Sequence, residues 1–498
     1  MIPIAQGTKE IGSKDFSGGL NTISDFFTLA ENESPDALNV KFNFDGSVQK
    51  RPGYVALTNA AIGPGGGYGL FDFGVASINN LMAAVGTGLF YSPDFGVTWI
   101  QILTNKAAQR TYYSRVKDWA IATDDAYDQP YYWTGSAGAV GTTAGWMVQM
   151  NSAPSCRYSM EYQGYGLLMN DTVNTLKIAY EDTNTFLSGD WGDYFSIPAE
   201  RSDQITGGTV LNNKAYVFTK YKIFRVTFVG GNPDFAYVEV KNFGFVPGAW
   251  SKVSLKDAGE VIIGLSYDKR IRVFDGSNDT IISDKVEADN KLSDFALSKL
   301  SDAQLENSNA TSDSAEQVWK LSVCVAPSAD ITHTLCLNLR NLAFYVHTYS
   351  SPMVSMVMTE SAGKQYLVGQ GSNSRVFQMD TSNTDAGIAI QDKYVSPFIF
   401  DESPTKVTKG TKTSFFFAVS SANSVYLEDR TNFNNTWTLR EIFTIPSITS
   451  SNQVKKTTDL PVTFNAYQYK ISSSSGTSDA WKLNRVDGLY ISRGYGKG

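Results

Sequence analysis

A hairpin unit that recurs along most of the chain is the feature that most constrains its fold. Between about residue 70 and about residue 385, an apolar alternating segment is followed by a short polar turn and a second alternating segment. A period of two is the pattern of a half-buried β-strand, so each unit predicts two antiparallel strands. The clearest copy spans residues 215–219 and 223–226. Further copies lie at residues 81–91, 118–122 with 130–133, 166–169 with 176–180, 261–265 with 271–274, 318–323 with 335–339, and 365–368 with 375–378.

The spacing of these units indicates a β-propeller. Successive units lie roughly 40–60 residues apart, which is close to the length of one four-stranded blade. One small sheet is too thin to bury both of its faces, and stacking such sheets around an axis supplies the missing core. We therefore predict an all-β fold with six or seven blades, and an array of β-sandwiches is the alternative. The composition agrees, since 13% of the residues are aromatic and only 18% are charged.

Three regions are predicted along the chain. Residues 1–55 form an N-terminal extension with a hairpin, residues 56–385 form the propeller, and residues 386–498 form a C-terminal β-sandwich-like domain. Strand-like segments of the last region lie at residues 414–419, 424–428, 437–443, 467–471 and 481–491. Apolar residues near helical spacing at 285–305 predict one or two short helices on a blade insertion. The Ser/Gly-rich stretch at 472–478 predicts a solvated loop.

The hairpin of the N-terminal region has a clear turn signal. Segments 40–44 and 47–51 alternate, and Asp45-Gly46 between them is a favoured two-residue turn. Residues 52–54 follow as Pro-Gly-Tyr. The simplest role for this region is a strand that closes the propeller ring by pairing with the last blade.

A Ser-x-Asp-x-Gly-x-Thr-Trp segment, formed by Ser92, Asp94, Gly96, Thr98 and Trp99, predicts a tight turn between two strands. The aspartate can accept backbone N–H groups across the turn, and the glycine supplies a positive φ that a side chain would penalise. The tryptophan then restarts a strand as a large apolar plug. This segment resembles the Asp-box of β-propeller proteins such as sialidases and sortilins. We interpret it as a structural turn, because Asp-boxes lie on the blade edge away from the active centre.

Scarce histidines and cysteines argue against several kinds of catalytic site. The chain has only two histidines, His333 and His347. Zinc sites and Ser-His-Asp or Cys-His catalytic arrangements therefore have almost no histidine to use. His333 and Cys336 lie in an alternating segment that would place them on opposite faces of a strand. Cys156, Cys324 and Cys336 are widely spread, which predicts buried reduced thiols. We predict no catalytic, cofactor or metal residues, although a carboxylate-only glycosidase stays open.

The charge and hydropathy patterns limit the partners. A formal charge of −7 disfavours general binding to nucleic acid, but an acidic wall would let a polyanion slide without sticking. No stretch approaches the roughly eighteen consecutive apolar residues of a membrane span, so no membrane partner is expected. The first residues lack the basic and apolar regions of a signal peptide, and we expect synthesis in a cytosol.

The N-terminal region resembles a known family. The similarity lies in residues 16–21, 33–40 and 45–54, which are similar to the opening of the tail hub, or nozzle, of short-tailed phages, also called the packaged-DNA stabilisation protein. The motif residues are Gly18, Gly19, Leu20, Asn21, Lys50, Arg51, Pro52 and Gly53. These proteins open with a Gly-Gly-Leu-Asn segment and a Lys-Arg-Pro-Gly-Tyr hairpin before a β-propeller. The match covers about a tenth of the chain.

The resemblance implies a structural virion protein of the phage tail. Such a protein forms a homo-oligomer, expected to be a hexamer, below the portal and its adaptor ring. It closes the DNA channel, conducts passing viral DNA on ejection without sequence-specific binding, and carries the tail spike, fibre or needle. The family brings no catalytic residue and no cofactor.

Two other functions remain open. A receptor- or glycan-binding tail propeller could use the aromatic loop at residues 127–133, although such rings more often wedge blades together. A sialidase-like glycosidase would need clustered arginines, a Tyr–Glu nucleophile pair and an Asp acid, as that family's resemblance implies. Here Arg157, Arg201, Arg225 and Arg272 are scattered without a signature, and a shared fold is weak evidence for a shared reaction.

Overall fold

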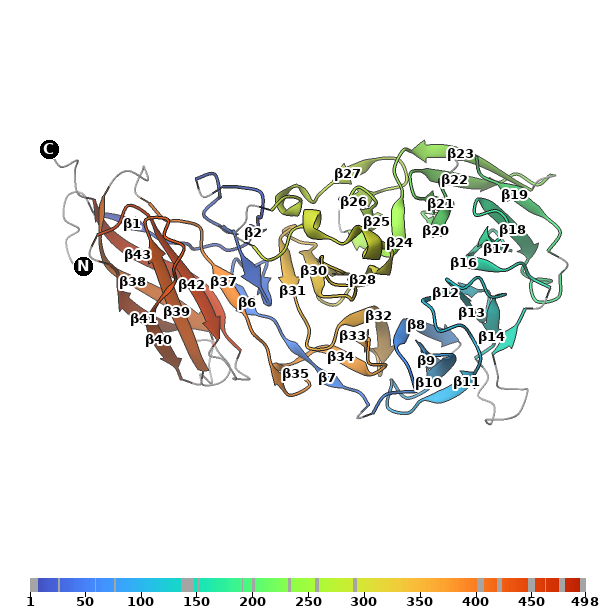
Figure 1. The fold of residues 1–498 in the computed structure, drawn as a ribbon, viewed down its shortest axis with the longest axis horizontal. Helices are drawn as coiled ribbons and strands as arrows, with labels where there is room; N and C mark the ends of the chain where they lie inside the picture. Colours follow the sequence, from blue (N-terminus) through green and yellow to red (C-terminus); the bar gives the residue numbers. More distant parts are fainter. Residues whose placement is uncertain are drawn as a thin grey trace.

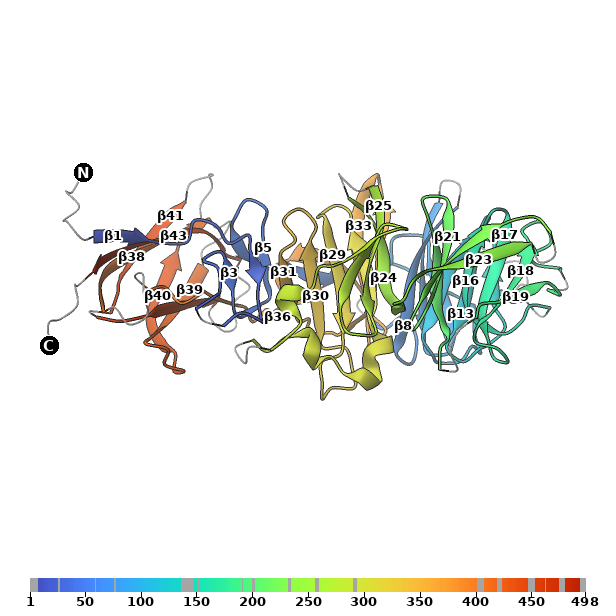
Figure 2. The same ribbon diagram turned by 90° about the horizontal axis from the view of Figure 1, so that it is seen from above.

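The computed structural model is almost entirely β-sheet (Figure 1). It describes residues 8–25, 27–58, 60–75, 78–135, 147–150, 152–189, 191–198, 202–231, 234–255, 259–289, 293–400, 407–418, 423–446, 453–461, 463–473 and 480–492. Seven small sheets surround a central axis, and a β-sandwich lies at one end of the molecule (Figures 1 and 2). The first strand and the C-terminal strands lie together in that sandwich. None of the helices among these residues is long and apolar enough to cross a membrane.

The propeller has seven blades, which confirms the predicted all-β propeller and decides between six and seven. Each blade is an antiparallel sheet of four strands. The first to third blades comprise β8 (Gly67–Val75), β9 (Ile78–Val85), β10 (Gly88–Ser92) and β11 (Ile100–Leu103); β12 (Thr111–Val116), β13 (Trp119–Asp124), β14 (Tyr131–Trp133) and β15 (Val148–Gln149); β16 (Cys156–Tyr162), β17 (Tyr165–Asp171), β18 (Lys177–Asp182) and β19 (Tyr194–Ser196).

The remaining blades follow the same plan. They comprise β20 (Ile205–Leu211), β21 (Lys214–Thr219), β22 (Ile223–Phe228) and β23 (Phe235–Lys241); β24 (Phe245–Leu255), β25 (Gly259–Ser266), β26 (Ile271–Phe274) and β27 (Asp279–Ile281); β28 (Asn309–Asp313), β29 (Val318–Val323), β30 (His333–Asn338) and β31 (Phe344–His347); β32 (Met353–Ser361), β33 (Lys364–Gly371), β34 (Val376–Ser382) and β7 (Gly53–Ala56). The innermost strands β8, β12, β16, β20, β24, β28 and β32 contact one another in a closed ring. Buried residues between neighbouring blades form the core, as the stacking argument requires.

An N-terminal strand closes the ring. β7 pairs antiparallel with β34, so the seventh blade takes three strands from the end of the propeller and its outermost strand from before the first blade. Ring closure was predicted for the N-terminal region as a whole, but only the segment after its hairpin takes part, because β5 and β6 pair in a different sheet. The short strands β35 (Thr384–Asp385) and β36 (Ile388–Ala389) continue the same sheet.

The sandwich contains strands from both ends of the chain (Figure 2). One sheet has β41 (Val454–Asp459), β38 (Thr408–Ala418), β43 (Lys482–Ser492), β6 (Val48–Lys50) and β5 (Val40–Phe42), with β1 (Thr8–Ile11) on β43; the other has β4 (Ala37–Leu38), β37 (Lys393–Val395), β42 (Tyr467–Ser473), β39 (Asn423–Thr431) and β40 (Thr438–Ile445). Phe415 fills the space between the two sheets, 5.5 Å from Phe443 and 5.4 Å from Tyr469 by ring centroids. The predicted hairpin of the N-terminal region is therefore present as β5 and β6, and it belongs to the sandwich.

Short helices occur in the insertion between the fifth and sixth blades. Among its described residues the insertion has three 3-10 helices, η2 (Asp284–Val286), η3 (Leu297–Lys299) and η4 (Asp302–Asn307), where the sequence predicted one or two short helices. Most of the predicted loop at 472–478 lies outside the described residues.

Candidate functional site

The Asp-box turn joins β10 to β11, the two outermost strands of the first blade. Asp94 accepts hydrogen bonds from the Thr98 N–H at 2.8 Å, the Thr98 hydroxyl at 2.6 Å and the Ser92 hydroxyl at 2.8 Å. Gly96 has a φ of 86°, and the Trp99 indole donates to its carbonyl at 3.0 Å. These bonds satisfy the turn internally, and they leave it on the rim, far from the inner strand β8.

Arg51 lies at the junction between the sandwich and the propeller. Its Nη1 and Nη2 donate to Asp385 at 2.9 and 2.7 Å, and both side chains are buried. Its Nε donates to the Asn39 side chain at 2.9 Å, and Nη2 also reaches the Thr348 carbonyl at 2.6 Å. The guanidinium carbon lies 4.4 Å from the centre of the Tyr349 ring. One side chain therefore joins the hairpin of the sandwich to the sixth and seventh blades.

Arg51 has two partners without a predicted role: Asn39, which lies in the resemblance segment 33–40, and Asp385, which no motif in the sequence singled out. Asn39 has a φ of 55°, and it donates through Nδ2 to Thr348 Oγ1 at 2.9 Å and to the Gln391 carbonyl at 2.6 Å. Asp385 also accepts the Ser350 N–H at 3.0 Å. Asparagine is one of the few residue types that tolerate the left-handed region, but its partners lie about 300 residues away and carry no local signal.

Lys50 makes a second buried contact inside the sandwich. Its Nζ lies 3.6 Å from Asp392 Oδ1, and both side chains are essentially fully buried. The Trp481 indole donates to Asp392 Oδ2 at 2.8 Å, and the Ser473 N–H donates to the same oxygen at 3.1 Å. Burial raises the pKa of Asp392, against the opposing effect of Lys50. The lysine of the motif, Lys50, is therefore a buried structural residue of the sandwich.

The Gly-Gly-Leu-Asn motif packs against the sixth blade and its neighbouring insertion. Gly19 and Leu20 form β2, which pairs in parallel with β3 (Glu33–Ser34). A Cβ on Gly18 would approach the Asn32 carbonyl within 2.8 Å, and Gly19 has a φ of 74°. Leu20 is fully buried. These contacts explain why the segment needs glycines.

Asn21, Pro52 and Gly53 complete the predicted motif. The Asn21 Nδ2 donates to Glu33 at 2.8 Å, and its Oδ1 accepts two backbone N–H groups. The Pro52 carbonyl accepts a hydrogen bond from Arg51 at 2.9 Å. Gly53 opens β7, and a Cβ there would lie 2.0 Å from the Thr384 carbonyl oxygen. The structure therefore gives each motif residue a packing or hydrogen-bonding role, with Gly18 to Asn21 beside the sixth blade, Lys50 inside the sandwich, and Arg51 to Gly53 where the sandwich meets the propeller.

The 3-10 helix η4 is bound by side chains from several blades. Arg110, just before β12 of the second blade, donates to the carbonyls of Glu306 and Ser308, the latter at 2.8 Å. Tyr267 from the fifth blade donates to the Glu306 carboxylate at 2.9 Å, and Lys220 from the fourth blade lies 3.3 Å from the same group. Residues from three blades therefore hold η4 in place.

The arginines considered for a glycosidase are not clustered. Arg157, on β16, pairs with Asp125. Arg272, on β26, pairs with Asp268 and Asp279 at 2.8 and 3.1 Å. Arg225 lies on β22 of another blade, and Arg201 lies outside the described residues.

The aromatic loop considered for glycan binding is largely inside the fold. Trp133 is 1% exposed and packs 4.7 Å from the Tyr91 ring, and Tyr131 is also buried. Tyr127 is half-buried, and its hydroxyl donates to Asn170 at 3.0 Å. These rings pack between blades, as the structural interpretation of the loop expects.

Metal ligands do not gather in the part of the chain that the structure describes. No group of three or more His, Cys, Asp or Glu side chains could hold an ion there. The three cysteines are free and buried, as predicted. Burial raises the pKa of Cys336 to about 12, and the His347 Nδ1 lies 3.6 Å from its sulfur.

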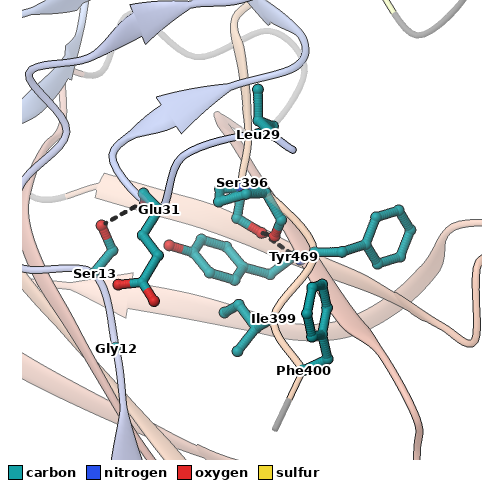
Figure 3. A pocket seen from close by; sticks show the side chains of 10 residues that line it. Gly12, Ser13, Leu29, Glu31, Ser396, Ile399, Phe400 and Tyr469 are labelled. Carbon is teal, nitrogen blue, oxygen red and sulfur yellow. Dashed lines mark hydrogen bonds between the residues drawn. The ribbon is translucent and has the colours of Figure 1, made fainter. Parts of the chain in front are cut away.

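A cavity of about 210 Å³ lies in the sandwich (Figure 3). Leu29 and Ile399 form apolar walls, and the Tyr469 ring lies between Ile399 and Glu31. Ser13 donates to the Glu31 carbonyl at 3.4 Å. This volume is below the several hundred cubic ångströms of an ordinary small-molecule site, so the cavity suits at most one side chain or a few solvent molecules.

Comparisons with known proteins identify no family. No family model matches the chain, and no curated protein matches it. Among solved structures, the crystal structure of BBS1N in complex with ARL6DN aligns at 8% identity and a TM-score of 0.39, over 68% of this chain and 99% of that one. The extracellular domain of the putative one component system BT4673 from B. thetaiotaomicron aligns at 8% identity and a TM-score of 0.44, over 88% of this chain and 61% of that one.

Proposed function

We propose that this chain is a structural virion protein, the tail hub or nozzle of a short-tailed phage. In this role, identical copies form a ring, expected to be a hexamer, below the portal and its adaptor. The ring closes the DNA channel before ejection and conducts the DNA afterwards. The observation that carries the proposal is the N-terminal motif, whose residues resemble that family and have packing or hydrogen-bonding roles in this fold.

A rigid junction suits a component that bears mechanical load. Arg51 holds a buried carboxylate from the far side of the junction, and β7 of the propeller follows the hairpin of the sandwich without a linker. The apolar core is also continuous, since Phe42 of the hairpin lies 6.4 Å from Tyr345 of the sixth blade and 6.1 Å from Tyr394 of the sandwich. Interfaces that are large and apolar restrict domain motion. The two parts therefore act as one body.

DNA would follow the axis of the assembled ring in this proposal. Each copy carries a formal charge of −7. A ring of such copies would repel the phosphate backbone and let it pass without sequence-specific binding. The adaptor and portal would lie on one side, with a spike, fibre or needle on the other.

Electron microscopy of the particle that contains this chain tests the proposal directly. We expect a closed ring of identical copies on the portal axis. Sedimentation of the purified chain, alone and with its portal–adaptor complex, gives an independent measurement. A chain that stays monomeric in both samples and is missing from the portal axis would overturn the proposal.

A further inference from the structure

A pocket of about 430 Å³ lies between the hairpin of the sandwich and the sixth blade. β5 and β6 form one wall, and the turns before β29 and after β30 form the other. Clefts between two packed units are favoured places for ligand sites, and this volume is within the usual range for a small ligand. Its lining residues are Lys41, Asn43, Phe44, Asp45, Gln49, Ala315, Glu316, Asn338, Arg340 and Lys482.

The pocket lining has three cationic side chains and two anionic ones, so one cation has no counter-charge in the pocket. Lys41 pairs with Glu316, and Lys482 donates to Asp45 at 2.6 Å. Arg340 is exposed, and its guanidinium has no ion-pair or hydrogen-bond partner within the described ranges. A guanidinium presents a planar fork that matches a carboxylate. The pocket therefore has an anion-binding group that the protein itself does not use.

One amide group of the pocket lining is also available. Lys41, Gln49 and Lys482 lie opposite one another on β5, β6 and β43, so their side chains form a row on one face of the sheet. The lysines in this row are paired, whereas the Gln49 amide makes no hydrogen bond to any described residue. One amide offers both a donor and an acceptor, which is the combination that a sugar hydroxyl needs.

Phe44 provides an apolar surface at the edge of the pocket. It occupies the end of the hairpin, and 62% of its side chain is exposed. The neighbouring Asn43 side chain donates to Ser47 at 2.9 Å, which holds the turn in shape. A fixed, exposed ring can cover the apolar C–H face of a sugar.

We propose that this pocket binds an acidic saccharide, with one sugar ring against Phe44 and its carboxylate on Arg340. Gln49 bonds the hydroxyls of the same ring. A saccharide with one carboxylate per ring matches the one unpaired cation, whereas a nucleotide phosphate would bring more negative charge than Arg340 balances. This site goes beyond the structural role proposed above and does not depend on ring assembly.

Calorimetric titration of the full chain tests the site. The probes are glucuronic acid and digalacturonic acid, with glucose as the neutral analogue and uridine monophosphate as the nucleotide. We expect saturable binding of the acidic sugars and at least about tenfold weaker binding of glucose, because a charged hydrogen bond is lost. Arg340→Gln and Phe44→Ala should each weaken acidic-sugar binding about tenfold, and Phe44→Trp should restore it. Lys364→Gln, an exposed change on the seventh blade, is the matched control.

Neither Arg340→Gln nor Phe44→Ala should disturb the fold. Both test side chains are exposed, so their variants should keep the circular dichroism spectrum and unfolding midpoint of the parent. Absence of acidic-sugar binding overturns the proposal, and so does binding that neither Arg340→Gln nor Phe44→Ala weakens. Uridine monophosphate that binds more tightly, with the same dependence on these residues, would overturn it in favour of a nucleotide site.

Discussion

Arg51 and Asp385 form a two-pronged ion pair across 334 residues of sequence, with N–O distances of 2.9 and 2.7 Å. Their side chains are only 1% and 4% exposed. Arg51 directly follows the hairpin of the sandwich, and Asp385 lies in β35 beyond the seventh blade. The pair therefore fixes the sandwich and the closing strand β7 at one point.

Removing this arginine should destabilise the whole protein. Arg51→Met leaves Asp385 buried without its counter-charge, and we expect a loss of about 3–5 kcal/mol in the free energy of unfolding. Arg51→Lys should recover only part of this, because an ammonium cannot make the parallel pair of bonds. Urea denaturation followed by circular dichroism measures both. Arg115→Met, which breaks an exposed pair with Asp118, is the control and should cost less than about 1 kcal/mol. Equal losses in the two Met variants would contradict this role.

Gly53 should be irreplaceable at the start of β7. A Cβ there would lie 2.0 Å from the Thr384 carbonyl oxygen, so the two strands would have to separate. We expect Gly53→Ala to cost roughly 3 kcal/mol, as measured by the midpoint of thermal or urea unfolding. Gly66→Ala is a matched control, because its nearest neighbour would be 3.5 Å away. If both changes leave the midpoint unaltered, the close approach has no importance for ring closure.

Local pattern explains why so much of the propeller could be predicted. The segments 215–219 and 223–226 became β21 and β22, which are neighbours in both sequence and sheet. The blade number stayed open because β7 and β34 are far apart in sequence. The helical spacing of apolar residues correctly predicted short helices in the insertion, but these are 3-10 helices. Each 3-10 helix there has a single buried residue, so no continuous apolar face exists to support a longer helix.

The junction could be predicted only in part. Resemblance identified Lys50 and Arg51, but their partners Asp392 and Asp385 lie more than 300 residues away in segments without any signal. The pocket beside Arg340 was missed for the same reason, since its walls come from two separate regions. Such sites depend on tertiary packing, which alternation along one segment does not encode.

Asp94 should stabilise the first blade in a pH-dependent way. Partial burial raises the pKa of Asp94, but hydrogen bonds from Thr98 and Ser92 outweigh it and leave the pKa below its ordinary value. The contribution of the ionised Asp94 to the free energy of unfolding is therefore complete above about pH 3.9, and it is lost as the pH falls through the pKa that Asp94 has in the folded state. Asp94→Asn should cost about 1 kcal/mol at pH 7, and the difference should shrink toward pH 3. Urea unfolding at both pH values measures it, and a difference that grows in acid would contradict the assignment.

The two histidines should make the fold less stable in mild acid. Burial lowers the pKa of His333 and lowers that of His347 well below its ordinary value. As the pH falls, the histidines of the unfolded chain are protonated before those of the folded protein. The neutral histidines therefore contribute fully to the free energy of unfolding above about pH 6.5, and this contribution is lost as the pH falls toward their folded-state pKa values. With only two histidines, proton NMR can follow both rings directly. We expect them to stay neutral below about pH 6.5 in the native protein and to titrate near that value in urea. A native His347 that titrates at or above it would refute the prediction.

Arg110 should hold η4 against the propeller. Its guanidinium donates to the carbonyls of Glu306 and Ser308, and a Cβ on Gly248 would lie 2.2 Å from its Nη2. Arg110→Met removes both bonds, and Gly248→Ala displaces the guanidinium and also strains a φ of 64°.

Hydrogen exchange followed by mass spectrometry measures the effect of these two changes. We expect at least about tenfold faster exchange in η4 for both variants, since two hydrogen bonds are together worth more than 1.4 kcal/mol. The inner strands should keep their protection, because the blades close through β7 and not through η4. Arg225→Met on β22 is the control and should leave η4 unchanged. If η4 in Arg110→Met exchanges as in the parent, the helix is held by Tyr267 and Lys220 alone, and its position does not depend on the second blade.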